Sequence, residues 1–384
     1  MAMVLEFVVT LLLSVLAVMA GVRWGRLLVR RGATANNFFT GKNIESIAFL
    51  GLYILLLLLA LYLPQLQILP LEWRVSGMRV TWSIMRILLV GFCGAAFWVS
   101  YQTDRRQMIA VVLLGVIGWG GFTSAEAYFL APIYPSLRDH LMPNGVYRQT
   151  SNSSCAPAAM ATILRQWDLD IPESRVAQLA GTSRLGTSMP QLIMAARSLG
   201  LDAVELSPTW EQMRQMNRPG VLATWLYSRS GRDPHAVGLV AMTADTVTIA
   251  DPAFGKLYEL NRASFDRIWR KEYVPIFRPE DLQLTRSEAA NYLRRLGYLQ
   301  PTATSGVSQA LQSFQREMGL SVTGRLDPQT ILLLTGSFLS DVPTLSQPLS
   351  AKTTASSLNG SPGVEPRRVK VAYRQMPPDR LLAQ

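Results

Sequence analysis

The sequence predicts a multi-domain protein: a four-helix transmembrane region, an α+β domain, and a small three-helix domain, in that order. Long apolar runs fill the first 135 residues and then stop. Between residues 144 and 279, helical periodicity comes first and strand-like runs follow, which favours an α+β fold with an antiparallel sheet. From residue 282 to 336, three short helical patterns follow one another, each with one apolar face.

Four apolar runs in the N-terminal region approach the roughly 20 residues that a helix needs to cross the hydrocarbon core of a bilayer. The first run has no basic n-region and no small-residue cleavage site, so we expect an anchor rather than a cleaved signal peptide. Arg86 in the third run lies close enough to one end to extend its guanidinium to the interface. The expected spans are residues 4–22, 47–66, 80–101 and 108–128.

The distribution of arginines predicts the orientation of these spans. Basic residues concentrate in the first loop, at Arg23, Arg26, Arg30, Arg31 and Lys42, and in the short third loop, at Arg105 and Arg106. The longer second loop has only Arg74 and Arg79. The positive-inside rule places the first and third loops in the cytoplasm. We therefore expect a multi-pass protein of a bacterial inner membrane, with everything after about Tyr134 in the periplasm.

The charge balance restricts the class of partner. The net charge is +11, much of it from the arginines that flank the apolar runs. The remaining basic residues form no dense run interleaved with aromatic residues, so we expect no nucleic-acid partner. Lipid headgroups or an anionic wall polymer account for the charge equally well. Two histidines and two scattered cysteines cannot form a compact zinc site, and no nucleotide-binding glycine loop is present. No metal and no cofactor are expected.

The stretch "RQTSNSSCAPAAMATILRQW", residues 148–167, places a cysteine at the expected start of a helix. Ser153 or Ser154 can act as the N-cap, and Cys155 would then lie among unpaired backbone N–H groups that favour a thiolate. The other cysteine, Cys93, lies in an apolar run. The pattern alone leaves two readings of Cys155 open: a nucleophile, or a small buried apolar residue.

A thiolate nucleophile needs a base and a group that orients it. His140 follows the last membrane segment, whereas His235 opens the strand-like run "HAVGLVAM", so His235 is the natural candidate. Asp251 ends the next strand-like run and precedes a proline, which is also ordinary turn chemistry. In a tight hairpin Asp251 would lie opposite about residue 238. A bulge, a strand twist or a long reach is therefore needed to bring it to His235.

The order of these residues resembles the C39 peptidases, which are papain-like cysteine proteases known as processing domains of peptide exporters. Gln149 stands six positions before Cys155, and the Asp-Pro pair begins sixteen positions after His235. The resemblance covers about residues 147–277 and implies a peptidase domain over residues 144–279. It implies that Cys155 is the nucleophile, His235 the general acid/base and Asp251 the orienting acid. Gln149 would donate its side-chain amide to the oxyanion, a contribution of roughly 2–4 kcal/mol.

Two features depart from that family. Ala156 follows the cysteine where members commonly have glycine. The chain also contains no G-x-x-x-x-G-K-[ST] loop, so it lacks the ATPase signature of an exporter. The trimming of double-glycine leaders before export is therefore not carried over to this chain.

The stretch "FQREMGLSVTGRLDPQT", residues 314–330, resembles the peptidoglycan-binding-like domain, a small helical module. The resemblance implies that residues 282–336 bind peptidoglycan, which agrees with the orientation from the arginines. We expect the apolar faces of the module to be consumed by its own core, so that it acts as a separate tether. Residues 337–384 are rich in Ser, Thr, Pro and Gly and are expected to form a flexible tail.

The sequence thus predicts a membrane-anchored cysteine peptidase that cleaves peptides or proteins outside the cytoplasm by a Cys-His-Asp mechanism, tethered to the cell wall. Two alternatives stay open. One is an amidase-like cysteine hydrolase that cuts peptide crosslinks of the wall. The other is a catalytically silent domain that holds a peptide or peptidoglycan, in which Cys155 would react with thiol reagents no faster than free cysteine.

Overall fold

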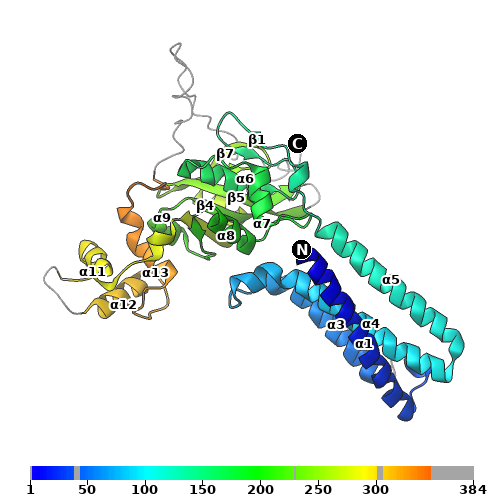
Figure 1. The fold of residues 1–384 in the computed structure, drawn as a ribbon. Helices are drawn as coiled ribbons and strands as arrows, with labels where there is room; N and C mark the ends of the chain where they lie inside the picture. The colour runs from blue at the N-terminus through cyan, green and yellow to red at the C-terminus, as the bar shows by residue number, and fades with distance from the viewer. Residues whose placement is uncertain (1, 39–43, 229–230, 301–305, 347–384) are drawn as a thin grey trace. The chain divides into compact units, whose positions relative to one another are not determined.

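The computed structural model describes residues 2–38, 44–228, 231–300 and 306–346 (Figure 1). The chain forms two compact units, Met1–Ala131 and Pro132–Gln384. The first is helical, and the second contains a mixed helix-and-sheet domain followed by a helical module.

The N-terminal unit has fewer candidate spans among its described residues than expected. Its helices are α1 (Ala2–Arg30), α2 (Ala35–Phe38), α3 (Ile44–Tyr62), α4 (Leu71–Thr103) and α5 (Arg105–Phe129). Three are long and apolar enough to cross a membrane: Val8–Arg30 of α1, all of α4, and all of α5. The run expected to span residues 47–66 forms α3, whose described apolar part, Ile47–Ala60, is shorter. A 3-10 turn containing Pro64 follows α3, because proline lacks the N–H that a continuing helix needs.

Glycines let α1 and α4 pack at close range. A Cβ added to Gly21 would lie 1.9 Å from the carbonyl oxygen of Gly91, and one added to Gly25 would lie 2.7 Å from that of Ala95. No residue with a side chain fits at Gly21 unless the helices separate. Such small residues are typical of helix pairs in membranes, where close backbone approach replaces the hydrophobic driving force.

Arg86, which the sequence places near one end of an expected span, pairs with an acid on the next helix. Its Nη2 lies 2.8 Å from Glu126 Oε2, and the two side chains are 12% and 18% exposed. Two charges in an apolar setting are costly unless they are paired. This ion pair therefore links α4 to α5.

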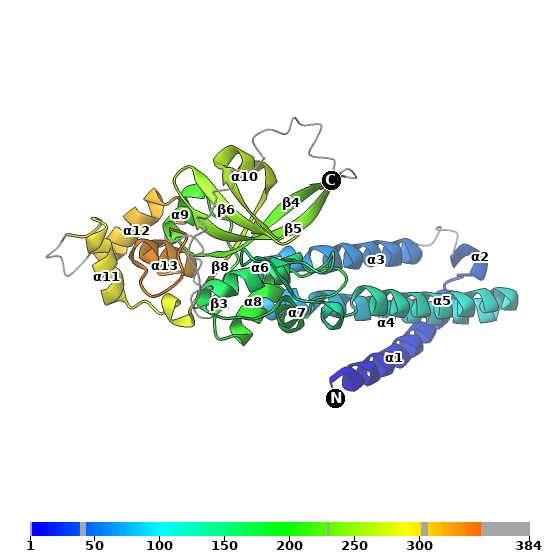
Figure 2. The same ribbon diagram turned by 90° about the horizontal axis from the view of Figure 1, so that it is seen from above.

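The second unit contains the antiparallel sheet that the sequence predicts. Its strand order is β3-β8-β4-β5-β6-β7, with every neighbouring pair antiparallel (Figure 2). The strands are β3 (Asp202–Ala203), β4 (Gly220–Ser228), β5 (Gly231–Met242), β6 (Thr246–Asp251), β7 (Lys256–Asn261) and β8 (Trp269–Phe277). A separate two-stranded ribbon is formed by β1 (His140–Leu141) and β2 (Tyr147–Arg148).

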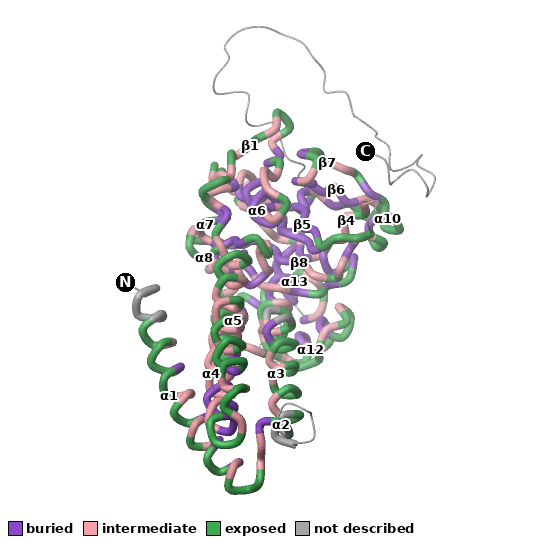
Figure 3. Tube along the Cα trace, turned by 90° about the vertical axis from the view of Figure 1, so that its right-hand side faces the viewer, coloured by how far each residue is buried: buried purple, intermediate pink, exposed green. Residues whose placement is uncertain are grey.

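Among the described residues of the second unit, four α-helices precede β4 in the sequence, and a fifth lies between β7 and β8. They are α6 (Cys155–Leu164), α7 (Glu173–Ala180), α8 (Met189–Ser198), α9 (Trp210–Met216) and α10 (Arg262–Ile268). Helix α6 is buried along its whole length after Cys155, as its alanine-rich sequence allows, and it packs on the central strands β4 and β5. Figure 3 shows buried segments concentrated in these strands and in α6.

The C-terminal module has the three expected helices, α11 (Arg286–Arg295), α12 (Val307–Glu317) and α13 (Pro328–Thr335). The core of this module, however, is shared with the preceding domain. Leu332 and Leu333 of α13 belong to the same buried cluster as Met213 and Met216 of α9. The Nε2 atom of Gln212 donates a hydrogen bond to the carbonyl oxygen of Met318 over 2.6 Å. The expectation of a separate tether is therefore wrong, because α9 presents an apolar face that the module covers.

The first part of the expected tail is packed rather than flexible. Leu345 is 2% exposed, and its backbone N–H and C=O bond to the backbone of Asn217 and Met242. Burial of the apolar Leu345 side chain in the core explains why this segment is ordered despite the polar composition around it. Residues 347–384 lie outside the described residues.

Candidate active site

Three of the residues predicted for the site come from three different elements. Cys155 is the first residue of α6 and is half-buried, with a free thiol. His235 lies in β5 and is 7% exposed, and Asp251 ends β6 and is 4% exposed. His235 Nε2 lies 2.9 Å from Asp251 Oδ1. This bond leaves Nδ1 as the ring nitrogen that can serve the thiol.

The register explains how Asp251 reaches His235. Gly238 lies opposite Ala250, so Asp251 would extend the ladder to a position two residues from His235. The register shifts between Leu239 and Ala241, so a bulge is the one of the three expected devices that brings Asp251 closer to His235. The N–H of Ala253 donates to Asp251 Oδ1 over 2.9 Å, so the Asp-Pro turn itself holds the carboxylate.

The surroundings of His235 favour its protonated form. Burial disfavours the imidazolium, but hydrogen bonds and attraction from Asp251 and Cys155 outweigh burial and raise the pKa of His235 to about 9. Both contacts favour a positively charged ring, so His235 can hold a proton beside the Cys155 side chain at neutral pH.

Gln149 contacts both the turn after Asp251 and the turn before Cys155. Its backbone N–H donates to the carbonyl oxygen of Pro252 over 2.9 Å, which ties it to the turn after Asp251. Its side-chain Nε2 donates to the carbonyl oxygen of Ser151 over 3.0 Å, which leaves a second amide hydrogen on the same atom. Because Cys155 opens α6, its N–H belongs to the first-turn donors that no helical carbonyl accepts.

Sequence reasoning misplaced one detail of the turn before α6. Ser154 is the N-cap residue, yet its side chain makes no capping bond. The Ser154 hydroxyl instead donates to the carbonyl oxygen of Ser151 over 2.9 Å and accepts from the Ser151 N–H over 3.0 Å. The serine run before the cysteine therefore builds a closed turn.

Sequence reasoning missed Glu173, at the start of α7. Its side chain is fully buried and accepts two hydrogen bonds from Thr150, the residue after Gln149. Burial raises the pKa of Glu173, and hydrogen bonds from Ser154 and Thr150 act in the opposite direction. An acid directly after Pro172 is typical of a helix first turn, so no local pattern indicates that this side chain is turned inward.

The remaining candidates lie apart from this arrangement. His140 is exposed in β1, and Cys93 is buried in α4. Over the parts of the chain that the structure describes, no group of three His, Cys, Asp or Glu side chains is placed to hold a metal ion.

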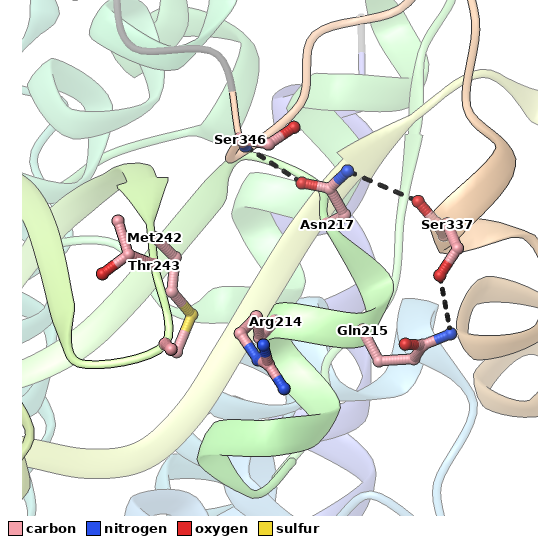
Figure 4. Close-up of a pocket in the computed structure, with 9 residues that line it drawn as sticks. Arg214, Gln215, Asn217, Met242, Thr243, Ser337 and Ser346 are labelled. Carbon is pink, nitrogen blue, oxygen red and sulfur yellow. Dashed lines mark hydrogen bonds between the residues drawn. The ribbon is translucent and has the colours of Figure 1, made fainter.

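A cavity of about 250 Å³ lies where α9 meets the chain after the module (Figure 4). Asn217, Thr243 and Ser346 are among its lining residues, whereas the four predicted site residues are not. Asn217 Oδ1 accepts from the N–H of Ser346 over 3.1 Å across it. The cavity belongs to the junction with the module and not to the thiol.

The fold and the site together define a class: an α+β domain in which a thiol at a helix start meets a His–Asp pair carried by an antiparallel sheet, as in cysteine peptidases. The family model described as the Peptidase C39 family matches residues 144–281. The model described as a putative peptidoglycan binding domain matches residues 285–334. Through the first of these segments, the chain belongs to the Peptidase C39 family.

Relatives match the same segment. The chain is 33% identical over 136 residues to an uncharacterized protein of Methanothermobacter marburgensis, which covers 35% of this chain and 90% of that protein. An uncharacterized protein of Methanothermobacter thermautotrophicus matches with the same identity and coverage. The lactococcin-G-processing and transport ATP-binding protein LagD of Lactococcus lactis is 28% identical over 124 residues, which cover 32% of this chain and 17% of LagD.

Solved structures are similar to parts of the chain. The peptidase domain of Streptococcus ComA, a bi-functional ABC transporter, has a TM-score of 0.31 and 16% identity, covering 34% of this chain and 96% of that one. A periplasmic domain of the EpsAB fusion protein of the Vibrio vulnificus type II secretion system has a TM-score of 0.29 and 12% identity. That match covers 50% of this chain and 85% of that one.

Proposed function

We propose that this protein is a membrane-anchored cysteine peptidase that cleaves peptide bonds on the extracytoplasmic side. The observation that carries the proposal is the buried His235–Asp251 pair beside Cys155, with Nε2 and Oδ1 2.9 Å apart. Membership of the Peptidase C39 family supports the same reaction class.

The geometry supports a two-step acyl transfer. The Cys155 thiolate attacks the scissile carbonyl carbon, and the carbonyl π electrons move onto oxygen, where the free amide hydrogen of Gln149 and the N–H of Cys155 can stabilise them. His235 gives its proton to the leaving amine as the C–N bond breaks. Water then attacks the thioester, gives a proton to His235, and releases the acid and the thiolate. Asp251 holds the ring and stabilises its charge.

The substrate class follows from family membership and from one relative. LagD is named as a processing protein, which supports a peptide or a protein as the substrate here. Transport is not proposed, because the similarity reaches only 17% of LagD.

The location follows from charge and from the C-terminal module. If the basic ends after α1 and between α4 and α5 both face the cytoplasm, the chain between Arg31 and Leu71 must cross the membrane. Only α3 lies there among the described long helices. Its 19 residues reach about 28 Å at 1.5 Å per residue, and its apolar part, Ile47–Ala60, supplies about 21 Å of that length. A bilayer whose hydrocarbon core is roughly 30 Å thick can accommodate a shorter apolar stretch by local thinning. We therefore take α3 as a fourth crossing, with the peptidase on the side of the wall.

Hydrolysis of wall peptide crosslinks is the second candidate. It is favoured by the core shared between α9 and α13, which holds the peptidoglycan-binding-like module against the peptidase rather than on a free linker. A module held in a fixed position could keep bound peptidoglycan near the thiol.

The decisive experiment compares peptides and wall fragments released by cells that carry the native chain or its Cys155→Ala form, with Cys93→Ala as the matched control. We expect products that depend on Cys155 and not on Cys93. The purified chain should also react with iodoacetamide at Cys155 faster than free cysteine does. Hydrolysis that survives Cys155→Ala would overturn the proposal, and a reaction rate equal to that of free cysteine would favour the silent binding domain.

A further inference from the structure

The turn that joins Gln149 to Cys155 is held by a carboxylate from another helix. Glu173 is 0% exposed. Its Oε1 accepts the Thr150 N–H over 3.0 Å, and its Oε2 accepts the Thr150 hydroxyl over 2.8 Å. Both carboxylate oxygens thus accept from Thr150, which stands directly after Gln149 in the chain, and the Ser154 side chain also contacts the carboxylate.

Thr150 passes this constraint to the Gln149 side chain through Ser151. The Ser151 carbonyl oxygen accepts from Gln149 Nε2 over 3.0 Å, and it also accepts from the backbone N–H of Ser154 over 3.2 Å. The direction of that carbonyl thus fixes one amide hydrogen of Gln149 and aims the other. Any rotation at Thr150 would turn the Ser151 carbonyl and the amide with it.

The Thr150 hydroxyl needs an acceptor at Glu173. It already accepts the N–H of Arg138 over 3.2 Å, so its own hydrogen goes to Oε2. A carboxylate offers an acceptor to both Thr150 donors, whereas a carboxamide offers one acceptor and one donor. A glutamine at position 173 would therefore leave one Thr150 donor facing an N–H group, with little change in volume.

A neighbouring acid shows what a purely structural carboxylate does here. Asp139 accepts the N–H of Ser174 over 2.6 Å and the Ser174 hydroxyl over 2.5 Å, at the start of the same helix. It makes no described bond to residues 149–155. Asp139 thus binds Ser174 at the start of α7, whereas Glu173 binds Thr150 in the turn before the thiol.

We propose that Glu173 is a positioning residue of the active site, which holds Thr150 so that the free amide hydrogen of Gln149 meets the oxyanion formed at Cys155. This inference rests on the proposed function. It assigns Glu173 no contact with the substrate.

Two thiol probes separate positioning of the oxyanion donor from general reactivity. A peptide aldehyde accepts the Cys155 thiol at its carbonyl carbon: the S–C bond forms, the C=O π bond breaks, and the oxygen takes the proton to give a hemithioacetal. Iodoacetamide alkylates the Cys155 sulfur: an S–C bond forms at its methylene carbon, the C–I bond breaks with loss of iodide, and no oxyanion forms. The first reaction depends on Gln149, whereas the second depends only on the thiolate and its access.

The experiment uses the full chain in detergent with Cys93→Ser, so that Cys155 is the one thiol. A panel of acetyl-dipeptide aldehydes is titrated, and protection of Cys155 from iodoacetamide gives the dissociation constant of the strongest member. We expect Glu173→Gln to weaken that aldehyde at least about tenfold, within the effect of removing an oxyanion donor. The rate of alkylation without aldehyde should change less than about twofold, and Asp139→Asn should change neither quantity.

A double variant tests the route of the effect. If Glu173 acts through Gln149, then Glu173→Gln should add almost nothing to Gln149→Ala. Thr150→Val removes the hydroxyl contact alone, provides a second variant if Glu173→Gln does not fold, and should weaken the aldehyde by a smaller factor.

Several outcomes would overturn the inference: native aldehyde affinity in folded Glu173→Gln, equal losses with both probes, additive effects in the double variant, or no protection by any aldehyde. Failure of the proposed function has a different signature, which is hydrolysis that persists in Cys155→Ala.

Discussion

Asp281→Asn should destabilise the second unit strongly, because it removes the counter-charge of a buried guanidinium. The Arg218 side chain is 2% exposed, and its Nη1 lies 3.2 Å from Asp281 Oδ2. Its Nε and Nη1 make no hydrogen bond among the described residues, so the attraction of Asp281 is the main compensation. Burial lowers the pKa of Arg218, and Asp281 opposes that shift.

The expected size can be worked from this distance. Two unit charges 3.2 Å apart attract by about 5 kcal/mol at an effective dielectric constant of 20. Asp281 is 19% exposed, and asparagine keeps a polar contact, so the loss should be about 3 kcal/mol, at the low end for a broken buried pair. For a domain of this size, that corresponds to a melting temperature lower by about 6–12 °C.

The matched control is Asp266→Asn. Asp266 Oδ1 lies 3.1 Å from Lys271 Nζ, but these side chains are 43% and 58% exposed, so the loss should stay below about 1 kcal/mol. The assay heats the full chain in detergent, applies a brief protease pulse, and measures the surviving 132–384 unit on a gel. Equal shifts for the two variants would refute the reasoning, since the buried charge would then have another source of compensation.

Three further predictions concern the site and the membrane. The pKa of His235 is raised from its ordinary value of 6.5 to about 9. The protonated ring should therefore contribute its full stability below about pH 6.5, and this contribution should be lost as the pH rises through 9. The melting temperatures of the native chain and of His235→Gln, measured across that range, should converge at high pH. Asp251→Asn should lower hydrolysis less than His235→Ala does, measured on the same peptide, because an orienting group is partly replaceable; equal losses would give Asp251 a larger role. In spheroplasts of a Cys93→Ser, Cys155→Ser background, an impermeant thiol reagent should label a cysteine placed at Asn359 and spare one at Asn36; the reverse pattern would put the peptidase in the cytoplasm.

Local patterns predicted most of the sheet and the order of the site residues. The apolar runs at 220–227, 235–242 and 246–250 became β4, β5 and β6, because each has β-branched and apolar residues bounded by turn signals. The Gln, Cys, His and Asp of the family pattern could be proposed from the sequence because their types and spacing are specific. The approach of Asp251 to His235 could not be predicted, because the bulge between Leu239 and Ala241 depends on strand pairing that no local pattern shows.

Features that depend on contacts between distant segments were missed. Helix α10, Arg262–Ile268, is short and polar, and the buried Phe265 and the partly buried Ile268 pack it on the core. Glu173 is turned inward by Thr150, 23 residues earlier in the chain. The apolar faces of the C-terminal module were expected to be consumed by its own core, but α13 shares a buried cluster with Met213 and Met216 of α9. In each case the deciding partner is remote in sequence, where periodicity carries no information.

The core that α9 and α13 share limits how this architecture can be recombined. A wall-binding domain joined by a loose linker can be exchanged for another without consequence for its neighbour. Here a graft after Asp281 would have to supply apolar cover for Met213 and Met216 and a carbonyl acceptor for Gln212. It would also have to leave Thr335, or a substitute, within reach of Arg218. The two domains are therefore expected to diverge as a matched pair, with changes on one face of the junction answered on the other.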